Sequence, residues 1–467
     1  MKHRSDEAQS SGAQRASHGI SLTEAVRVWA RVALLSFGGP AGQIAVMHRI
    51  LVDEKRWIGE DRFLHMLNYC MLLPGPEAQQ LATYIGWLLH RTRGGLIAGT
   101  LFVLPGFVSI LILSVLYAGF REFSVVQAIF FGVKAAVLAI VIEAVVRISR
   151  RALKSAPLYL IAAAAFIAIF FFAVPFPFII VAAAFVGFVG GRLAPSRFLV
   201  AAGHAPKTGA GMPVIDSMLA EGQPEHTRPS LKRLAKVAAV CLTLWFAPLV
   251  ALASIMGSGH VFTQIGLFFS KLAVVTFGGA YAVLAYMAQE VVQNYGWLTP
   301  GEMLDGLGMA ETTPGPLIMV VQFVAFLGGY RDPGALDPYA AGVLASVLAV
   351  WVTFVPCFLW IFAGGPYAER LRGNRALSAA LSAITAAVVG VVLNLAVWFS
   401  LHVLFGRVEE IRTFGLRLQV PVLATVDLAS VGLAVAALIA LLRFKVGMIP
   451  TLGASAALGV LFYYTLR

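Results

Sequence analysis

The sequence predicts an all-α polytopic membrane protein built from two homologous repeats of inverted topology, with broken or re-entrant helices. Three observations carry this prediction: a very apolar composition, about thirteen hydrophobic segments in succession, and a motif that recurs in the second half. Of the 467 residues, 59% are hydrophobic and 12% are charged, whereas soluble proteins devote about a quarter of their residues to charged side chains. This composition excludes soluble enzymes, disordered proteins and nucleic-acid-binding domains.

The net charge of +12 is explained by basic loops at the membrane surface. The basic residues form short clusters between apolar runs, as the positive-inside rule expects of loops beside lipid headgroups. We therefore expect the lipid bilayer as a partner, and no nucleic acid. The three cysteines, Cys70, Cys241 and Cys357, lie far apart in apolar runs, so we expect neither disulfides nor a metal site.

A helix needs about 20 apolar residues to cross the hydrocarbon core. Two segments, 157–172 and 176–192, are short, and the sequence between them predicts a tight hairpin of two thin spans. The expected segments, in chain order, are 22–47, 61–90, 94–117, 124–147, 157–172, 176–192, 234–256, 262–290, 300–330, 339–362, 376–403, 420–442 and 446–465.

Polar stretches divide the chain. Residues 1–19 lack an apolar core and predict a disordered cytoplasmic extension, not a cleaved signal peptide. The proline-rich stretch 193–233 predicts a cytoplasmic linker. We expect the first repeat at 20–192, an orientation-reversing helix at 234–257 and the second repeat at 258–467.

The repeat is visible without gaps over residues 36–76. Twelve of these forty-one residues are identical to those 240 positions later. The matches include Phe37-Gly38-Gly39 with Phe277-Gly278-Gly279, Trp57 with Trp297, and Pro74-Gly75-Pro76 with Pro314-Gly315-Pro316. Chance matches between apolar sequences do not readily preserve such motifs in register.

Loop charge predicts that the two halves are inverted. In the first half, the loops that carry Arg91 and Arg151 are basic and are expected in the cytoplasm. In the second half, the loop matching Arg91 carries Asp332 and Asp337, whereas the basic loop falls at 369–375. This places the N-terminus in the cytoplasm and the C-terminus in the periplasm, an architecture found in secondary transporters.

Glycine and proline interrupt four apolar segments. They remove backbone donors and permit reversals, so each segment is either a broken span or a hairpin that returns to its starting side. Parity leaves both alternatives open. New half-helices begin after the breaks, and their free N–H groups predict an oxyanion site. The candidate residues are Gly38, Gly39, Pro40, Gln43, Pro74, Gly75, Pro76, Gln79, Gln80, Gly278, Gly279, Thr312, Thr313 and Gly315.

Charged residues inside apolar segments are further candidates. Lys134 lies mid-segment, where a charge is costly, so it should face a partner or a cavity and contribute to anion binding. Replacing it with methionine should therefore preserve folding. Glu77 follows Pro76 and is either a helix cap or a binding group whose protonation is linked to the anion. Arg31, Glu143 and Lys271 are candidates for gating or coupling, with snorkelling or an ion pair between Glu143 and Arg147 as the simpler interpretation.

Several of these motifs resemble the chromate ion transporter family, in its long two-domain form. The resemblance rests on Phe37-Gly38-Gly39-Pro40, Trp57 and the run from Leu73 to Gly86, and it extends from about residue 20 to 460. It implies an inner-membrane secondary transporter that exports chromate and gives chromate resistance, with about thirteen segments in oppositely oriented halves.

The substrate follows from this resemblance alone, because chromate and sulfate are similar tetrahedral dianions. Protons are the expected coupling ion of this antiporter-like transporter. An oxyanion channel with the same half-helix site is the alternative function. No motif of an enzyme, metal site or cofactor site occurs, so we expect none of the three. The sequence leaves the oligomeric state open, a dimer included.

Overall fold

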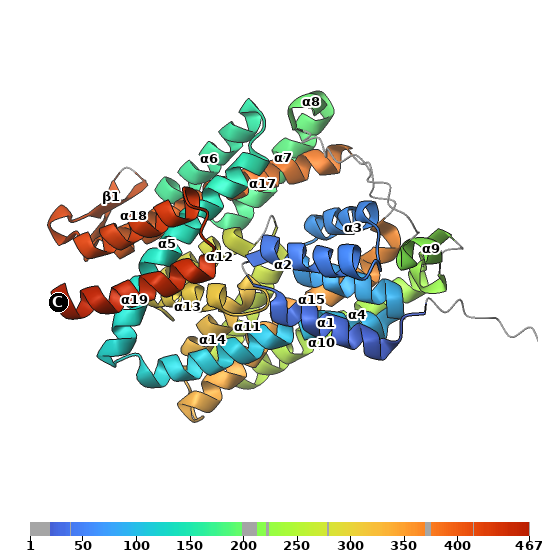
Figure 1. Ribbon diagram of the computed structural model, residues 1–467, viewed down its shortest axis with the longest axis horizontal. Coiled ribbons are helices and arrows are strands. Elements are labelled where there is room, and N and C mark those ends of the chain that lie inside the picture. The colour runs from blue at the N-terminus through green and yellow to red at the C-terminus, as the bar shows by residue number, and fades with distance from the viewer. Residues whose placement is uncertain are drawn as a thin grey trace, which may run out of the picture.

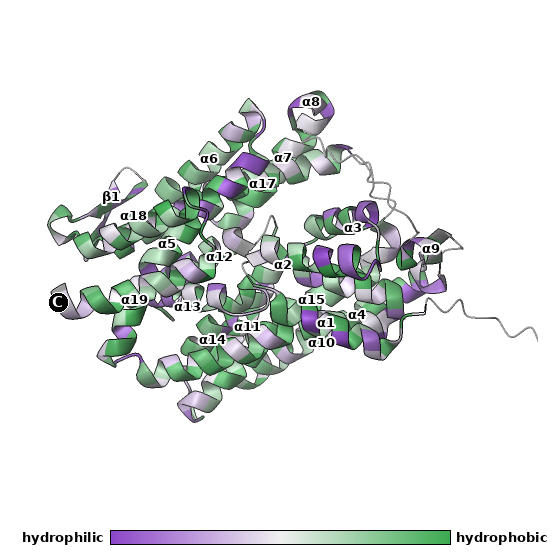
Figure 2. Ribbon diagram, in the orientation of Figure 1, coloured by the Kyte–Doolittle hydropathy of each residue, from purple (hydrophilic) through white to green (hydrophobic). Residues whose placement is uncertain are grey.

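The computed structural model describes residues 19–37, 39–198, 213–220, 224–277, 280–368, 375–413 and 415–466. Nearly all of these residues are helical (Figure 1), so the predicted all-α membrane fold is confirmed. Seven helices in this part of the chain are long and apolar enough to span a membrane, and four more are apolar but shorter. The green helices of Figure 2 show how apolar their surfaces are.

The first half begins with short helices and continues with long ones. Its elements are α1 (Leu22–Leu35), α2 (Gly39–His48), η1 (Arg49–Glu54), α3 (Glu60–Leu72), α4 (Glu77–Phe120), α5 (Ser124–Ala152), α6 (Ala156–Phe172), α7 (Phe176–Leu193) and α8 (Pro195–Phe198).

Three elements lie between the halves: α9 (Val214–Ala220), η2 (Glu225–Thr227) and α10 (Leu231–Met256). The second half repeats the order of short and then long helices. Its elements are α11 (Val261–Val275), α12 (Ala280–Gln289), η3 (Glu290–Asn294), α13 (Pro300–Thr312), η4 (Leu317–Met319), α14 (Val320–Arg331), α15 (Pro338–Gly364), η5 (Gly365–Tyr367), α17 (Arg375–Leu404), β1 (Val408–Thr413), β2 (Leu416–Pro421), η6 (Leu423–Thr425), α18 (Leu428–Leu442) and α19 (Met448–Leu466).

The interrupted segment 22–47 folds as a hairpin of half-helices rather than as a broken span. Lys55 Nζ lies 3.3 Å from a carboxylate oxygen of Glu24, at the start of α1, and Arg31 lies 2.7 Å from Glu54. A chain that crossed the membrane between these residues would separate them by about the 30 Å of the hydrocarbon core. The chain therefore returns to the side from which it entered.

The other three interrupted segments also reverse direction. In the α3–α4 hairpin, the rings of Tyr69 and Tyr84 lie 5.5 Å apart. In α11–α12, the ammonium of Lys271 lies 5.5 Å from the centre of the Tyr286 ring. In α13–α14, Arg331 donates a hydrogen bond of 2.5 Å to the backbone oxygen of Trp297, just before α13. Each half thus starts with two helical hairpins.

Helix α4 consists of two antiparallel helices joined at His90 and Arg91, whose backbone angles are not helical. The two parts touch closely: a Cβ atom on Gly86 would lie 2.5 Å from the backbone oxygen of Gly94 and 2.6 Å from the Cβ of Ala98. Only glycine permits this approach. The break agrees with the predicted boundary between segments 61–90 and 94–117.

Long helices of the first half pack against long helices of the second half. Helix α5 packs against α17, α18 and α19, whereas α17 also packs against α6 and α7. Glycines allow these contacts, since a Cβ atom on Gly132 would lie 1.9 Å from the backbone oxygen of Ser455 and one on Gly187 would lie 2.5 Å from the Cβ of Ala383. In Figure 1 these helices form the upper left part of the molecule, beside the part that contains α1–α4, α10, α11, α14 and α15.

Two regions differ from the sequence-based expectation. The segment expected at 420–442 begins its helix only at Leu428, because β1 and β2 precede it as an antiparallel pair in which Glu410 pairs with Arg412 and Arg417. Part of the expected linker is also packed: Asp216 of α9 accepts hydrogen bonds of 2.7 Å from the Gly59 backbone and the Arg62 side chain. Polarity alone does not reveal such docking.

Candidate functional site

The four chain breaks meet in the middle of the molecule. The backbone N–H of Gly75 donates a 2.9 Å hydrogen bond to the carbonyl of Thr276, and the N–H of Gly315 donates a 2.8 Å bond to the carbonyl of Ser36. Both pairs join a first-half break to a second-half break, at positions that the 240-residue offset relates. Gly75 and Gly315 adopt φ values of +117° and +99°, which disfavour other residues.

Buried amide side chains brace these breaks. Gln43 Nε2 donates a 2.7 Å bond to the Gly315 carbonyl, and Gln80 Nε2 donates a 2.7 Å bond to the Pro74 carbonyl. Gln79 bonds to Thr83 one turn later, at 3.1 Å. All three glutamines are at most 1% exposed. Their contacts hold the backbone in place, and their role toward an anion stays a prediction.

The remaining candidates at the breaks are less uniform. Gly39 and Pro40 lie in the first turn of α2, while Pro76 precedes α4 and Glu77 begins it, half-buried. The hydroxyls of Thr312 and Thr313 bond to carbonyls of their own helix. Three predicted glycines, Gly38, Gly278 and Gly279, lie outside the described residues.

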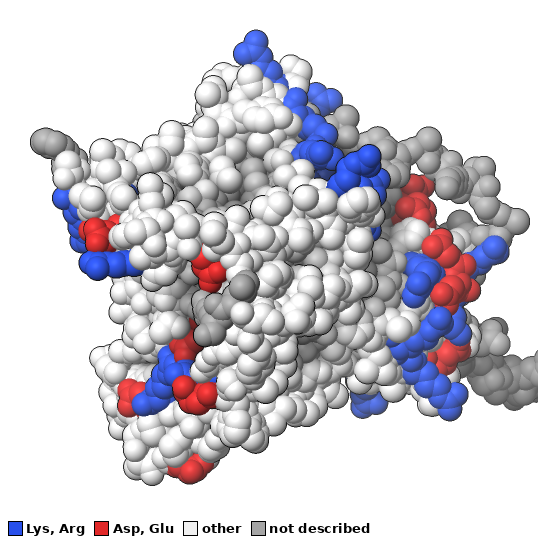
Figure 3. All heavy atoms as spheres, turned by 60° about the vertical axis from the view of Figure 1, so that its left-hand side comes forward, with Lys and Arg blue, Asp and Glu red and all other residues white. Residues whose placement is uncertain are grey.

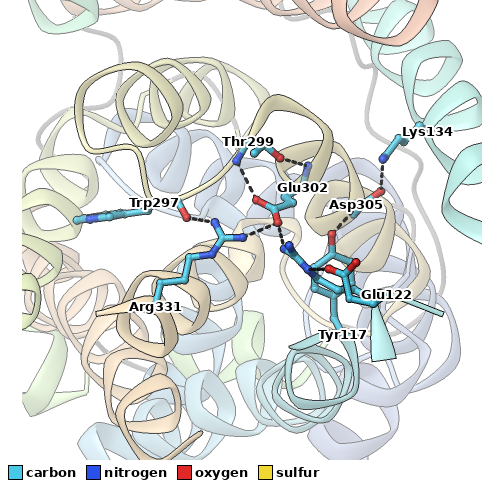
Figure 4. A network of polar contacts seen from close by, with 9 residues as sticks. Tyr117, Glu122, Lys134, Trp297, Thr299, Glu302, Asp305 and Arg331 are labelled. Atoms are coloured by element: carbon cyan, nitrogen blue, oxygen red, sulfur yellow. Dashed lines mark hydrogen bonds and ion pairs between the residues drawn. The ribbon is translucent and has the colours of Figure 1, made fainter. Parts of the chain in front are cut away.

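Lys134 has both a partner and a cavity, as the sequence predicts. Its Nζ lies 3.4 Å from Asp305 Oδ1, and its side chain is 30% exposed. It lines a cavity of about 520 Å³ between the halves, together with Arg121, Glu302 and His402. Asp305 also accepts a 2.8 Å hydrogen bond from Tyr117 (Figure 4). The charge of Lys134 is thus balanced by a buried carboxylate.

An ion-pair network closes the cavity wall beside Asp305. The carboxylate of Glu302 pairs with Arg121, from the end of α4, and with Arg331, from the end of α14, the latter at 2.5 Å (Figure 4). Glu302 and Thr299 also form a capping box at the start of α13. One buried acid therefore joins the two halves at this wall.

The lining of this cavity does not include the predicted gating residues. Arg31 pairs with Glu54, with half of its side chain exposed. Lys271 lies over the Tyr286 ring and is exposed. Glu143 pairs with Arg147 at 3.5 Å one helical turn later, which confirms the simpler interpretation of that pair. Their roles in gating or coupling stay predictions.

The most deeply buried acids were not predicted. Asp305 and Glu311 are each 3% exposed and Glu302 is 7% exposed, and all three belong to α13. Three acids in a 13-residue helix within an apolar run were the available signal. Their repeat mates are His65, Met71 and Arg62, so the repeat gave no support for singling them out.

The paired breaks and the repeated helix order fall within two regions of the chain that match a known protein family. The model of the chromate transporter family matches residues 23–188 and 263–460. The chain belongs to the chromate transporter family.

Relatives within this family agree over most of their length. Chromate transport proteins of Pseudomonas aeruginosa and Cupriavidus metallidurans are 32% and 28% identical to this chain, covering 77% and 80% of it and 76% and 81% of themselves. A probable chromate transport protein of Synechococcus elongatus is 26% identical over 80% of this chain and 83% of its own. No solved structure matches the chain. The family supports chromate transport across a membrane by a multi-pass protein.

Proposed function

We propose that this protein is a secondary transporter that exports chromate across the bacterial inner membrane in a proton-coupled manner and thereby gives chromate resistance. The observation that carries the proposal is the meeting of four chain breaks, joined by the bonds Gly75–Thr276 and Gly315–Ser36. Non-helical backbone at membrane depth must be covered by protein or line an aqueous path. Secondary transporters place their substrate sites at such breaks.

The anion would bind where half-helices start. The first turns of α2 and α4 begin at Gly39 and Glu77, and helix N-termini attract anions through unpaired N–H groups and the helix dipole. The candidate site comprises the break residues named above, with Lys134 adding positive charge along the path. For proton coupling, the sequence offers the carboxylate of Glu77.

Export fits the physics of a dianion. With the cytoplasm negative by about 100 mV, moving two negative charges outward is favourable by about 4.6 kcal/mol, at about 2.3 kcal/mol per charge. The lining of the Lys134 cavity contains Glu122, Glu302, Asp305 and Asp427 against Arg121 and Lys134. This excess of acidic side chains over basic ones would repel a released anion and so hinder its return into the cavity. In the proposed topology this cavity opens to the periplasm.

Counterflow in proteoliposomes tests the proposal. Vesicles loaded with unlabelled chromate should accumulate labelled chromate transiently, a pH gradient should change the rate, and excess sulfate should compete if both anions bind. Transient accumulation requires a carrier. Flux that never exceeds equilibration would favour an oxyanion channel, and absence of any chromate flux in well-folded protein would contradict the proposal.

A further inference from the structure

A buried carboxylate that forms no ion pair among the described residues lies at the meeting point of the chain breaks. Glu311, in the last turn of α13, is 3% exposed. Its Oε1 accepts a 2.7 Å hydrogen bond from the hydroxyl of Tyr281 in α12. Its Oε2 has no hydrogen-bond partner among the residues that the structure describes.

Glu311 and Tyr281 connect the breaks of both halves. Glu311 directly precedes Thr312 and Thr313, which lead into the break at Gly315. On the other side, a Cβ atom on Gly39 would lie 3.8 Å from the Tyr281 hydroxyl and 3.9 Å from Leu317. The pair therefore lies beside the first turn of α2, where the proposed anion would bind.

Within the part of the chain that the structure describes, no ion pair joins Glu311 to a cation. The ionisable groups that interact with it are Tyr281 of α12 and, from α5, Arg147 and Glu143. Arg147 is engaged by Glu143 at 3.5 Å. A buried carboxylate that lacks a paired cation is most stable in its neutral form.

The other acids of α13 show the difference. Asp305 lies 3.4 Å from Lys134, and Glu302 pairs with Arg121 and Arg331. Both can remain charged in the interior because a cation accompanies them. Among the buried acids of this helix, Glu311 is therefore the one whose neutral form the surroundings favour most, because no ion pair among the described residues holds its charge.

We propose that Glu311 binds the proton that is coupled to oxyanion transport, with Tyr281 holding its carboxylate; the inference rests on the proposed proton-coupled transport. The proton comes from water and binds to a carboxylate oxygen, and it returns to water when the carboxylate is next exposed. A neutral Glu311 accepts a dianion beside Gly39, whereas a charged Glu311 repels it. Proton occupancy and anion affinity are therefore linked, and the linkage is reciprocal.

The test compares Glu311→Gln with Glu77→Gln, which removes the half-buried carboxylate at the neighbouring break. Both variants and the wild-type protein are assayed in proteoliposomes for chromate counterflow from pH 6 to pH 8, and for flux driven by a pH gradient. Chromate itself titrates in this range, so the variants are compared at equal pH. A single linked proton changes the apparent affinity by at most about tenfold per pH unit.

We expect Glu311→Gln to retain counterflow, to lose the stimulation by a pH gradient, and to bind chromate with less pH dependence than the wild type. Glu77→Gln tests the other candidate carboxylate: loss of the stimulation and of the pH dependence in this variant, with both kept in Glu311→Gln, would assign the coupled proton to Glu77. A Glu311→Gln variant that keeps the wild-type pH profile and stimulation would overturn the inference. If the wild-type protein itself gave no chromate counterflow, the proposed function would fail instead.

Two further variants keep the test decisive if Glu311→Gln does not fold. Glu311→Asp retains a carboxylate with a shorter side chain, and Tyr281→Phe removes the hydrogen bond to it. Both should keep gradient-driven flux but shift the midpoint of its pH profile. Unshifted midpoints in both variants, with monodisperse protein, would show that this carboxylate does not bind the coupled proton.

Discussion

At the scale of single residues, the pair of Lys134 and Asp305 sets the charge of the cavity. Their side chains lie 3.4 Å apart, and Asp305 is almost fully buried. Removing one member of such a pair leaves the other desolvated and uncompensated. The sequence suggested that Lys134→Met would preserve folding, but that expectation did not include Asp305.

We therefore expect Lys134→Met to lower the stability of the protein as well as its chromate transport. The loss should be about 1–3 kcal/mol, as for a buried group that loses its partner. The double variant Lys134→Met, Asp305→Asn should recover the melting temperature in detergent but not the transport. A double variant as unstable as the single one would show that Asp305 is not the reason for the loss.

At the scale of helices, the two breaks at Gly75 and Gly315 differ in what surrounds them. A Cβ atom on Gly75 would lie 2.8 Å from Gln80 Nε2 and 2.9 Å from Cys357 Sγ, which are side-chain atoms. On Gly315 it would lie 3.1 Å from the backbone of Gly106 in α4. A side chain can move aside more easily than a packed helix backbone.

Alanine at either position adds strain, because a left-handed conformation costs about 1–2 kcal/mol in a residue with a Cβ atom. We expect Gly315→Ala to lower the melting temperature more than Gly75→Ala, since only the former presses on backbone. Gly257→Ala, where φ is also positive but nothing lies within 4 Å, serves as the control for strain alone. Equal losses at Gly75 and Gly315 would contradict this ranking.

The β1–β2 hairpin offers a prediction about pH. Burial raises the pKa of Glu410, but hydrogen bonds and ion pairs from Arg412 and Arg417 outweigh this effect and hold the pKa below its ordinary value. Its ion pairs thus stabilise the hairpin at pH values above about 4.3, the pKa of a free glutamate. This stabilisation disappears as the pH falls through the lower folded-state pKa.

At neutral pH, Glu410→Gln should speed hydrogen exchange of the amides in residues 408–421. The increase should stay below about tenfold, because partly exposed ion pairs contribute at most about 1 kcal/mol. Near pH 3 the difference between variant and wild type should shrink. A difference that grows on acidification would mean that the ion pairs do not stabilise the hairpin.

At the scale of the whole molecule, the face shown in Figure 3 carries most of its charged side chains toward the left-hand edge and along the top and right-hand side, with largely uncharged surface between them. A band of this kind suits contact with lipid chains. The predicted inversion of the halves concerns which end each loop faces. Arg151 belongs to a basic loop and Asp332 to an acidic loop, and both residues are exposed.

Cysteine labelling tests the inversion. In a background with Cys70, Cys241 and Cys357 replaced by alanine, Asp332→Cys should react in intact cells with a thiol reagent that cannot cross the membrane. Arg151→Cys should react only after the membrane is opened. If both cysteines react from the same side, the halves are not inverted and the proposed topology fails.

The sequence by itself determined the fold class, most segment boundaries and the repeat, because these depend on local apolar runs and on glycine and proline motifs. It also indicated that Lys134 needs a partner, since a charge at mid-membrane depth is costly. It did not predict strands β1 and β2. The length and polarity of this stretch do not distinguish a loop from a hairpin, and the ion pair between the two strands that supports the extended chain forms only in the folded protein.

Only the tertiary structure decided between broken spans and hairpins, because this depends on which ends meet, as Glu24 and Lys55 do. It also selected partners that are remote in sequence: Tyr117 and Asp305 are 188 positions apart, and Gln43 and Gly315 are 272 apart. A residue's own sequence neighbours fix its burial cost. How that cost is met depends on the helices that pack against it, which is why Glu311 emerged only from the folded chain.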